Sequence, residues 1–325
     1  MSIQDNLNID LESVEDIIRC TTLSSLLEVS GYPKPGNIHR TKDFNKTRFE
    51  HFLAGIAAIQ PVFSNFCNRI YKLTKIQKKK ANFNYLDLGK FFIESTKEMI
   101  NWQKGGNILL GHILILGPLA ASAAISLKLG KKTLEEYKNI LNQVIDDATV
   151  FDTINLYEAI KLSQPGGLGK IDKYDLTDKN SIKEIKKDKV KLREIFVLSQ
   201  NYDLISKEYS TGFHIIINEG LPFFLKSFNK SNDVNIATVH TFLKLLSNHP
   251  DTLIIRKSGM KAAEMVSEKC SKILKAGGLI TYEGKKLIYE LDETLQEKDG
   301  KLNPGTTADL IAGILFMALI LGLKF

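Results

Sequence analysis

The chain has 325 residues, 43% of them hydrophobic, and 44 lysines and arginines against 37 aspartates and glutamates give a formal net charge of +7. A chain of this length and composition can bury a substantial core, which excludes an intrinsically disordered protein. No Pro/Ser-rich linker separates two halves, so we expect a single domain over residues 1–325.

Helical spacing dominates from one end of the chain to the other, because apolar residues recur three and four positions apart. This pattern predicts an all-α fold, a single large multi-helix domain. The expected helices cover residues 17–29, 49–66, 86–102, 108–129, 134–145, 151–162, 190–227 with a break near Gly212, 236–246, 259–276 and 308–323. Short extended pieces fit the sequence around Ile254 and at residues 279–282, and the charged segment 172–188 is expected to be a lid or a loop.

Two stretches are apolar enough to be compared with membrane spans, residues 108–129 and 310–323. The first is interrupted by Pro118 and contains His112, and the second is shorter than the roughly 20 residues that a spanning helix needs. The mean hydropathy of the chain is −0.09. We therefore expect two buried, apolar helices at the centre of the protein and no membrane partner.

The cysteines and the N-terminal segment indicate a cytoplasmic protein. Cys20, Cys67 and Cys270 lie far apart and show no CxxC spacing, which argues against a disulfide scaffold and against a zinc site. The opening segment is acidic and lacks the basic start and apolar run of a secretory signal.

The excess of positive charge is concentrated in Lys75, Lys78, Lys79 and Lys80 and in residues 179–191. No nucleic-acid module and no aromatic residues interleaved with these lysines accompany them, so we interpret them as solvated loops and helix faces. No nucleic-acid partner is expected, and a helical nucleic-acid binder is the weaker alternative.

The first polar cluster begins at Glu28 and continues through a proline- and glycine-rich turn into the next helix. Lys34 and Arg40 offer cations that suit a polyphosphate, and Glu28, Asp43 and Glu50 offer carboxylates. The turn residues taken alone are also consistent with a simple chain reversal.

A second cluster, Gly105-Gly106-Asn107, precedes the apolar helix that contains His112. Paired glycines let a backbone approach a ligand closely, and a helix N-terminus can hold phosphate. A helix-capping turn explains Gly106 and Asn107 equally well, and His112 has the apolar neighbours of a core histidine.

Three aspartates could contribute ligands to magnesium, which prefers carboxylate and phosphate oxygens. Asp152 is followed by the glycine-rich segment 165–169, whose spacing matches neither a P-loop nor a dinucleotide fingerprint. Asp251 lies five residues before Arg256, a candidate phosphate clamp. Asp309 follows the Asn303–Thr307 turn, in a position that the helix dipole also favours for a carboxylate.

Taken in order, these clusters resemble the triphosphoribosyl-dephospho-coenzyme-A synthase family, and its shorter archaeal-type branch most closely. The resemblance covers residues 24–319 and is carried by EVSGYPKPGNIHR at 28–40, GGN at 105–107, PGGLG at 165–169, DTLIIRKSG at 251–259 and LNPGTTADL at 302–310. It implies an ATP-dependent transferase that moves a 5-triphosphoribosyl group from ATP to 3′-dephospho-coenzyme A or a related acceptor and releases adenine.

The resemblance also implies roles for the residues of these clusters. Phosphate binding would fall to Lys34, Arg40, Gly106, Asn107 and Arg256, magnesium binding to Asp152, Asp251 and Asp309, and the catalytic base would be Glu28, Asp43 or Glu50. The partners would be ATP and dephospho-coenzyme A or a similar acceptor, and a homodimer is the default for a soluble enzyme of this size.

The chain departs from the family pattern directly after the central asparagine. The citrate-linked members carry threonine and histidine there, whereas this chain has Ile108 and Leu109, which cannot make the same hydrogen bonds. An Arg-Gly-Glu segment is replaced by Tyr209-Ser210-Thr211. The alternative is therefore an altered or non-catalytic nucleotide-binding protein of the same fold.

Overall fold

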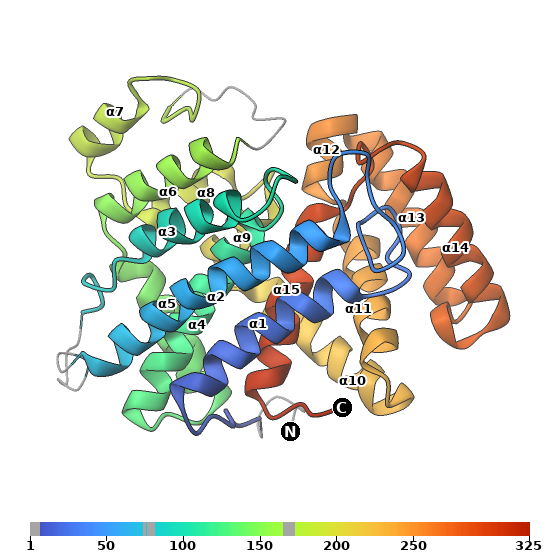
Figure 1. Ribbon diagram of the computed structural model, residues 1–325, viewed down its shortest axis with the longest axis horizontal. Coiled ribbons are helices and arrows are strands. Elements are labelled where there is room, and N and C mark those ends of the chain that lie inside the picture. Colours follow the sequence, from blue (N-terminus) through green and yellow to red (C-terminus); the bar gives the residue numbers. More distant parts are fainter. Residues whose placement is uncertain (1–6, 74–75, 77–81, 165–172) are drawn as a thin grey trace.

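The computed structural model describes residues 7–73, 76, 82–164 and 173–325, and this part of the chain forms helices and no named strand (Figure 1). The predicted all-α class is confirmed. The α-helices are α1 (Val14–Ser30), α2 (Phe49–Lys72), α3 (Leu88–Asn101), α4 (Leu110–Leu129), α5 (Leu134–Asp147), α6 (Val150–Ser163), α7 (Ser181–Asp188), α8 (Leu192–Ser199), α9 (Leu204–Thr211), α10 (Leu221–Ser231), α11 (Val234–Asn248), α12 (Thr252–Ser258), α13 (Met260–Lys275), α14 (Tyr282–Gln296) and α15 (Gly305–Ile320). A π-helix at Ile215–Gly220 precedes α10, and a 3₁₀ turn at Gly278–Ile280 precedes α14.

The two most apolar helices, α4 and α15, pack against each other in the middle of the fold, with almost every residue buried, as the sequence predicts. Gly313 of α15 lies so close to Ile115 of α4 that a Cβ there would come within 2.7 Å of the isoleucine side chain. In the described part of the chain, α4 is the one helix long and apolar enough to cross a membrane, but 89% of its most apolar window is buried inside the protein. Its apolar surface is therefore used for core packing.

The helix α4 continues through Pro118 without a break. Proline has no N–H, so the carbonyl of Leu114, one turn earlier, loses its helical donor. The hydroxyl of Tyr209 on α9 donates to that carbonyl at 2.6 Å. The carbonyl that the proline leaves free thus accepts a hydrogen bond from α9. This bond holds α9, which forms part of the wall of the cavity described below, against the central helix.

The remaining helices surround this centre in two groups (Figure 1). On one side α2 packs against α1, α3 and α4, while α6 packs against α3. On the other side α11 contacts α10, α13 and α15. The N-cap of α12, Asp251, hydrogen-bonds to Thr307 in the first turn of α15, so the starts of these two helices lie side by side.

Several sequence-based boundaries were wrong. α14 was not predicted, because its buried residues Ile288, Leu291 and Leu295 are separated by charged ones. The extended pieces expected near Ile254 and at 279–282 are the helix α12 and the 3₁₀ turn before α14. The break expected near Gly212 is present, where Gly212 and Phe213 have positive φ, but residues 190–211 contain a second break, because Asp203 caps a new helix, α9.

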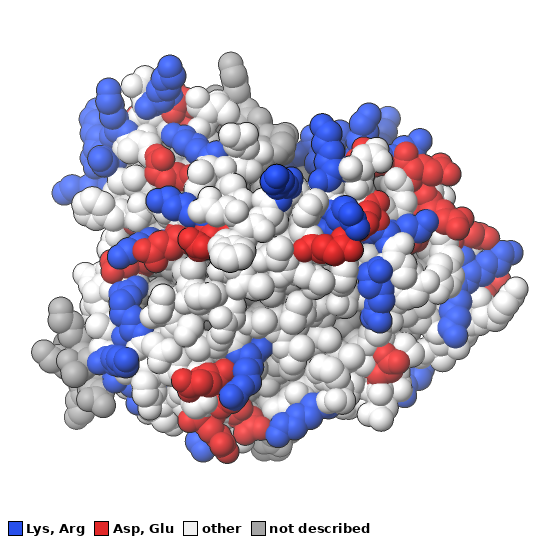
Figure 2. All heavy atoms as spheres, in the orientation of Figure 1, with Lys and Arg blue, Asp and Glu red and all other residues white. Residues whose placement is uncertain are grey.

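The lysine-rich segment 179–191 forms α7, which buries Ile185 and exposes its lysines. It lies in the stretch expected to be a lid or a loop, and its single buried isoleucine explains why no apolar period was visible. Figure 2 shows Lys and Arg side chains spread over several elements, many beside acidic ones, with a cluster at the corner where Figure 1 places α7. Lys75, Lys78, Lys79 and Lys80 lie outside the described residues.

Candidate active site

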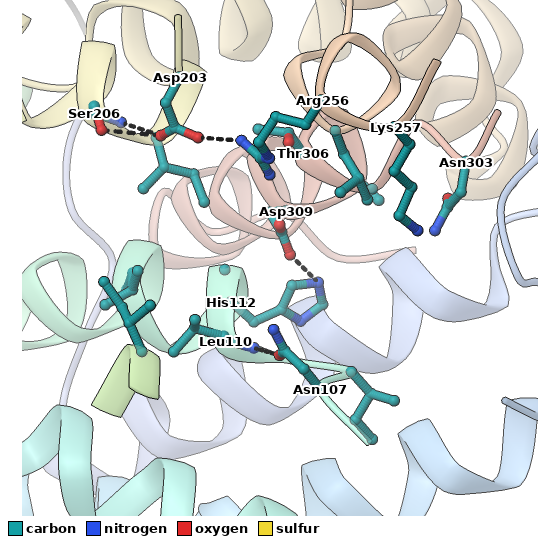
Figure 3. A pocket seen from close by; sticks show the side chains of 18 of the residues that line it. Asn107, Leu110, His112, Asp203, Ser206, Arg256, Lys257, Asn303, Thr306 and Asp309 are labelled. Atoms are coloured by element: carbon teal, nitrogen blue, oxygen red, sulfur yellow. Dashed lines mark hydrogen bonds and ion pairs between the residues drawn. The ribbon is translucent and has the colours of Figure 1, made fainter. Parts of the chain in front are cut away.

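A cavity of about 990 Å³ opens where segments from both ends of the chain meet (Figure 3). Its walls come from the end of α1, the loop before α2, the first turns of α4 and α15, α12, and the group α6, α8 and α9. The predicted site residues Glu28, Asn107, Arg256 and Asp309 all line it. The fold therefore brings together four of the residues predicted from distant parts of the sequence.

Glu28 lines the cavity and is held by two basic side chains. The ammonium group of Lys34, fully buried, forms an ion pair with one carboxylate oxygen of Glu28 and donates to the Glu28 carbonyl at 2.7 Å. Nε2 of His112 lies 3.3 Å from the other carboxylate oxygen. Burial by itself would raise the pKa of Glu28, but Lys34 and His112 hold that pKa below its usual value, so Glu28 is a carboxylate.

The hydrogen bonds around His112 determine where its protons lie. The Ser25 hydroxyl donates its single proton to the Thr21 carbonyl at 3.2 Å, so it must accept from Nδ1 of His112 at 3.3 Å. Nε2 then faces Glu28 at 3.3 Å and Oδ1 of Asp309 at 3.7 Å. An unprotonated nitrogen between two carboxylates would be repelled by both. One proton therefore lies between Nε2 of His112 and the facing carboxyl oxygens of Glu28 and Asp309.

Asp309 projects from the second turn of α15 into the cavity (Figure 3). It lies against Gly111 in the first turn of α4. A Cβ on Gly111 would come within 1.9 Å of Oδ2 of Asp309, so only glycine allows this approach. Burial, followed by the negative charges of Glu28, Asp251 and Asp203, raises the pKa of Asp309 well above its usual value against the opposing charge of Arg256. These surroundings favour the protonated form of Asp309, and an approaching cation would favour the carboxylate.

Two adjacent cations, Arg256 and Lys257, reach the cavity from α12. Arg256 uses one N–H to bind Asp203, the N-cap of α9, at 2.8 Å, and its other donors have no partner among the described residues. Lys257 donates to the Gly300 carbonyl at 3.0 Å. Burial and the neighbouring charge of Arg256 lower the pKa of Lys257 against the charge of Asp251. Lys46, an exposed cation of the loop before α2, also lines the cavity.

Asn107 lines the cavity at the N-terminus of α4, where its side-chain oxygen accepts from Leu110 N at 3.3 Å. Ile108 and Leu109 are buried, and both pack against Gly55 of α2, where an added Cβ would lie within 3.0 Å of each. Ile108 also lines the cavity. The substitution noted in the sequence therefore makes this part of the wall apolar.

One wall of the cavity is mostly apolar. Its lining side chains come from α6, α8 and the loop before α9 and include Leu156, Tyr157, Ile160, Phe196 and Tyr202. Sites of this kind, with an apolar wall and a few convergent polar groups, are typical of small-molecule binding. The cavity thus offers cations to an anionic group and apolar side chains to an uncharged ring or chain.

Two of the three predicted magnesium ligands are occupied by hydrogen bonds within the protein. Asp152 accepts from Gly89 N at 2.8 Å and from the backbone and hydroxyl of Thr149 at 2.6 and 2.8 Å. Asp251 accepts four hydrogen bonds, two from the first turn of α12 and two from Thr307. Neither residue lines the cavity. Their geometry is that of capping residues, and it gives no support to a metal-binding role.

The other predicted residues lie outside the cavity lining. Asp43 accepts from Phe49 N at the start of α2, Glu50 pairs with Arg48 on the surface, and Arg40 donates to the Ser30 carbonyl and to Asn235. Gly106 is exposed and has a positive φ. Of the carboxylates considered as base, only Glu28 reaches the cavity. The glycine-rich segment 165–169 lies outside the described residues.

Sequence reasoning missed several residues of the cavity or judged them incorrectly. His112 was interpreted as a core histidine, and it is indeed buried, yet its Nε2 faces Asp309. Lys46, Lys257, Asp203 and Asn303 were not selected. Lys257 could have been found, because it directly follows Arg256 within one matched motif. Lys46 and Asp203 carry no local signal, because only the fold brings them to the cavity.

Comparisons with known proteins agree with this picture. The sequence model of the family described as ATP:dephospho-CoA triphosphoribosyl transferase matches residues 14–324. A Klebsiella pneumoniae protein named 2-(5''-triphosphoribosyl)-3'-dephosphocoenzyme-A synthase is 21% identical over 94% of this chain and 91% of its own, and a Vibrio cholerae protein assigned the same name is 24% identical over 88% and 82%. A crystal structure from Archaeoglobus fulgidus, assigned as a triphosphoribosyl-dephospho-coA synthase, is 30% identical, with a TM-score of 0.60 over 85% of this chain and 100% of that one.

Proposed function

The chain belongs to the ATP:dephospho-CoA triphosphoribosyl transferase family, and from this premise we propose that it catalyses that transfer in the cavity described above. The donor is ATP, and the acceptor is 3'-dephospho-coenzyme A or a related alcohol. The observation that carries the proposal is the meeting of Arg256 and Lys257 with the His112–Asp309 pair in one cavity. The cations suit phosphate binding and the His112–Asp309 pair suits proton transfer, the two requirements of the reaction.

The reaction breaks the C1′–N9 bond of ATP and forms a bond between C1′ and an acceptor hydroxyl oxygen. The hydroxyl loses a proton, and the departing adenine gains one, so the balance closes without any further reactant. Glycosyl transfers of this kind pass through an oxocarbenium-like centre that nearby carboxylates stabilise. The site must therefore hold a triphosphate, move one proton and place a negative charge near C1′.

Arg256 and Lys257 are the residues that bind the triphosphate. Arginine suits this role because its planar fork presents several N–H donors to phosphate oxygens, and the pair with Asp203 orients the guanidinium group. Lys46, from the loop before α2, lines the same cavity and supplies a further cation. The apolar wall of the cavity holds an uncharged part of a substrate.

His112 is the residue that moves the proton. Its ring is fixed through Nδ1 by Ser25, and Nε2 points toward the two carboxylates. Glu28, a carboxylate paired with Lys34, lies 3.3 Å from Nε2 and stabilises a positive charge on this ring. A histidine held in this way can give its proton to the leaving base and take one from the acceptor.

Magnesium is the cofactor, and it is bound together with the triphosphate. No group of three or more His, Cys, Asp or Glu residues that could hold a metal occurs in the described part of the chain. Magnesium usually needs only one or two carboxylates when phosphates supply other ligands. Asp309 fits this requirement, because Oδ2 has no hydrogen-bond partner among the described residues and three negative charges surround the group. The ion would neutralise the developing charge on the phosphates.

An altered nucleotide-binding protein is the second candidate function. The observation that favours it is the apolar wall at Ile108, in place of the polar residues of citrate-linked relatives. In either case we propose a cytoplasmic protein that binds neither nucleic acid nor membrane and that forms a homodimer.

Release of adenine tests the proposal. Purified protein with ATP, magnesium and 3'-dephospho-coenzyme A should form free adenine, which chromatography detects. The variant Arg256→Ala/Lys257→Ala should lose most of this activity, whereas Lys90→Ala/Lys97→Ala, which removes two exposed lysines of α3, should retain it. Binding of ATP without adenine release across a panel of acceptor alcohols would instead establish the altered nucleotide-binding protein.

A further inference from the structure

A second cavity, of about 430 Å³, lies between α10, α11 and α13. It shares no lining residue with the candidate active site. Four lysines line it, and in the described part of the chain no acidic side chain does. These lysines are Lys226, Lys230, Lys244 and Lys275. Four like charges around a small concave space repel one another and attract an anion.

The histidine of this cavity supplies a second, independent sign of a ligand. His240 is 7% exposed, and its Nε2 accepts a hydrogen bond from Leu279 N at 2.8 Å. A backbone N–H can only donate, so Nε2 carries no proton and the neutral ring is protonated at Nδ1. No described residue offers an acceptor to that Nδ1–H. A largely buried histidine whose Nδ1–H has no protein acceptor therefore lines a cavity that four lysines also line.

Burial and the charge of Lys230 lower the pKa of His240, which keeps the ring neutral and this tautomer in place. Leu279 follows Gly278, where a Cβ would come within 2.4 Å of Nε2, so the turn before α14 packs directly on the ring. The imidazole ring is thus held in one orientation, with Nε2 against the turn. It cannot rotate to satisfy Nδ1 elsewhere without breaking the bond to Leu279.

The rest of the lining is apolar or weakly polar and includes Phe223, Leu274 and Ile280. Such walls favour a ligand that carries an uncharged part beside its anionic group. The cavity is too small for a folded partner, yet large enough for a molecule of roughly nucleotide size.

We propose that this cavity is a second binding site, for a phosphorylated small molecule. Its phosphate oxygens accept from His240 Nδ1–H and from the ammonium groups of Lys230 and Lys244, and its uncharged part lies against Phe223 and Leu274. A phosphate group matches this arrangement because it offers several acceptor oxygens to donors that approach from different helices. This site is separate from the transferase cavity and does not depend on the reaction proposed for it.

Calorimetric titration with inorganic pyrophosphate tests the proposal. The variant Lys230→Ala/Lys244→Ala should bind pyrophosphate more weakly at this site, by on the order of tenfold or more. The variant Arg256→Ala/Lys257→Ala, altered in the other cavity, should keep this binding, and so should the matched surface variant Lys90→Ala/Lys97→Ala. Unchanged binding by Lys230→Ala/Lys244→Ala, or a loss confined to Arg256→Ala/Lys257→Ala, overturns it.

A soak of crystals with tungstate gives a readout that does not depend on affinity. Density for the anion within hydrogen-bond distance of His240 Nδ1 supports the site, and density only at Arg256 and Lys257 overturns it.

Titration with AMP separates a nucleotide from a free phosphate. Tighter binding of AMP than of inorganic phosphate, lost in Lys230→Ala/Lys244→Ala, supports an organic phosphate. Equal binding of the two overturns the role given to Phe223 and Leu274.

Discussion

Nε2 of His112 lies 3.7 Å from Oδ1 of Asp309, which joins the first turn of α4 to the second turn of α15 in the lining of the cavity. Both residues sit on the two most buried helices of the protein, so their relative position is as rigid as the core itself. Glycine at position 111 permits the approach. The distance between His112 and Asp309 is therefore set by the packing of α4 against α15 more than by the surrounding loops.

Replacement of His112 by glutamine should lower kcat by about 10²- to 10⁴-fold, the usual contribution of a positioned acid or base. The KM for ATP should change little, because the phosphates are bound by other residues. Initial rates of adenine release over a range of ATP concentrations measure both quantities. A rise in KM at unchanged kcat would show that His112 only helps to shape the site.

Asp309→Asn should raise the magnesium concentration needed for half-maximal activity, since the amide is a poorer ligand than the carboxylate. Asp251→Asn is the matched control: Asp251 caps α12 and bonds to Thr307, so its replacement should reduce stability and leave the magnesium requirement unchanged. Activity is titrated with magnesium at fixed ATP. Equal magnesium curves for Asp309→Asn and the unaltered protein would exclude Asp309 as a ligand.

Lys34→Met should destabilise the protein by about 3–5 kcal/mol, because it leaves the buried carboxylate of Glu28 without its counter-charge. The double variant Glu28→Gln/Lys34→Met should recover much of this loss, because no uncompensated charge is then buried. Chemical denaturation of both variants measures the difference. Equal stability of the single and double variants would mean that the ion pair is not what holds this end of α1.

Tyr209→Phe should cost about 1–3 kcal/mol, since it leaves the Leu114 carbonyl buried without a donor. In a Pro118→Ala background the loss should be smaller, because alanine at this position supplies the N–H that proline lacks. A double-mutant cycle on thermal unfolding gives the coupling directly. Additive effects of the two changes would show that Tyr209 stabilises α9 through its ring alone.

Glu208 is predicted to make stability depend on pH. It is buried and accepts from Ile215 N and Ile216 N, and burial raises its pKa from 4.5 to about 8. Between these two pH values the folded state keeps a proton that the unfolded state has lost. The free energy of unfolding should therefore fall as pH rises from 4.5 to about 8 and then level off.

Glu208→Gln removes this proton from the balance. The free energy of unfolding of this variant should depend less on pH. The difference in free energy of unfolding between the unaltered protein and the variant should therefore become smaller as pH rises from 5 to 8. Urea unfolding at three pH values in that range measures this difference. A constant difference would show that Glu208 does not titrate there.

Much of the fold was determined by the sequence alone. The three- and four-residue spacing of apolar side chains identified most helices, and the two longest apolar runs, around Ile115 and Ile314, were correctly expected to be central and buried. The family could also be recognised, because its motifs occur in order along the chain. These properties are local, since spacing and motif order are read directly along the chain.

Only the tertiary structure decided which charged residues face the cavity. Asp152, Asp251 and Asp309 all lie at or near helix starts, and the sequence offers no means to tell a cap from a ligand among them. Asp152 and Asp251 are occupied both by donors at their own helix starts and by backbone N–H groups of α3 and α15. Asp309 stays open because its neighbours across the fold are Gly111 and His112. A carboxylate's role depends on which donors surround it in space, and that is fixed by how distant helices pack.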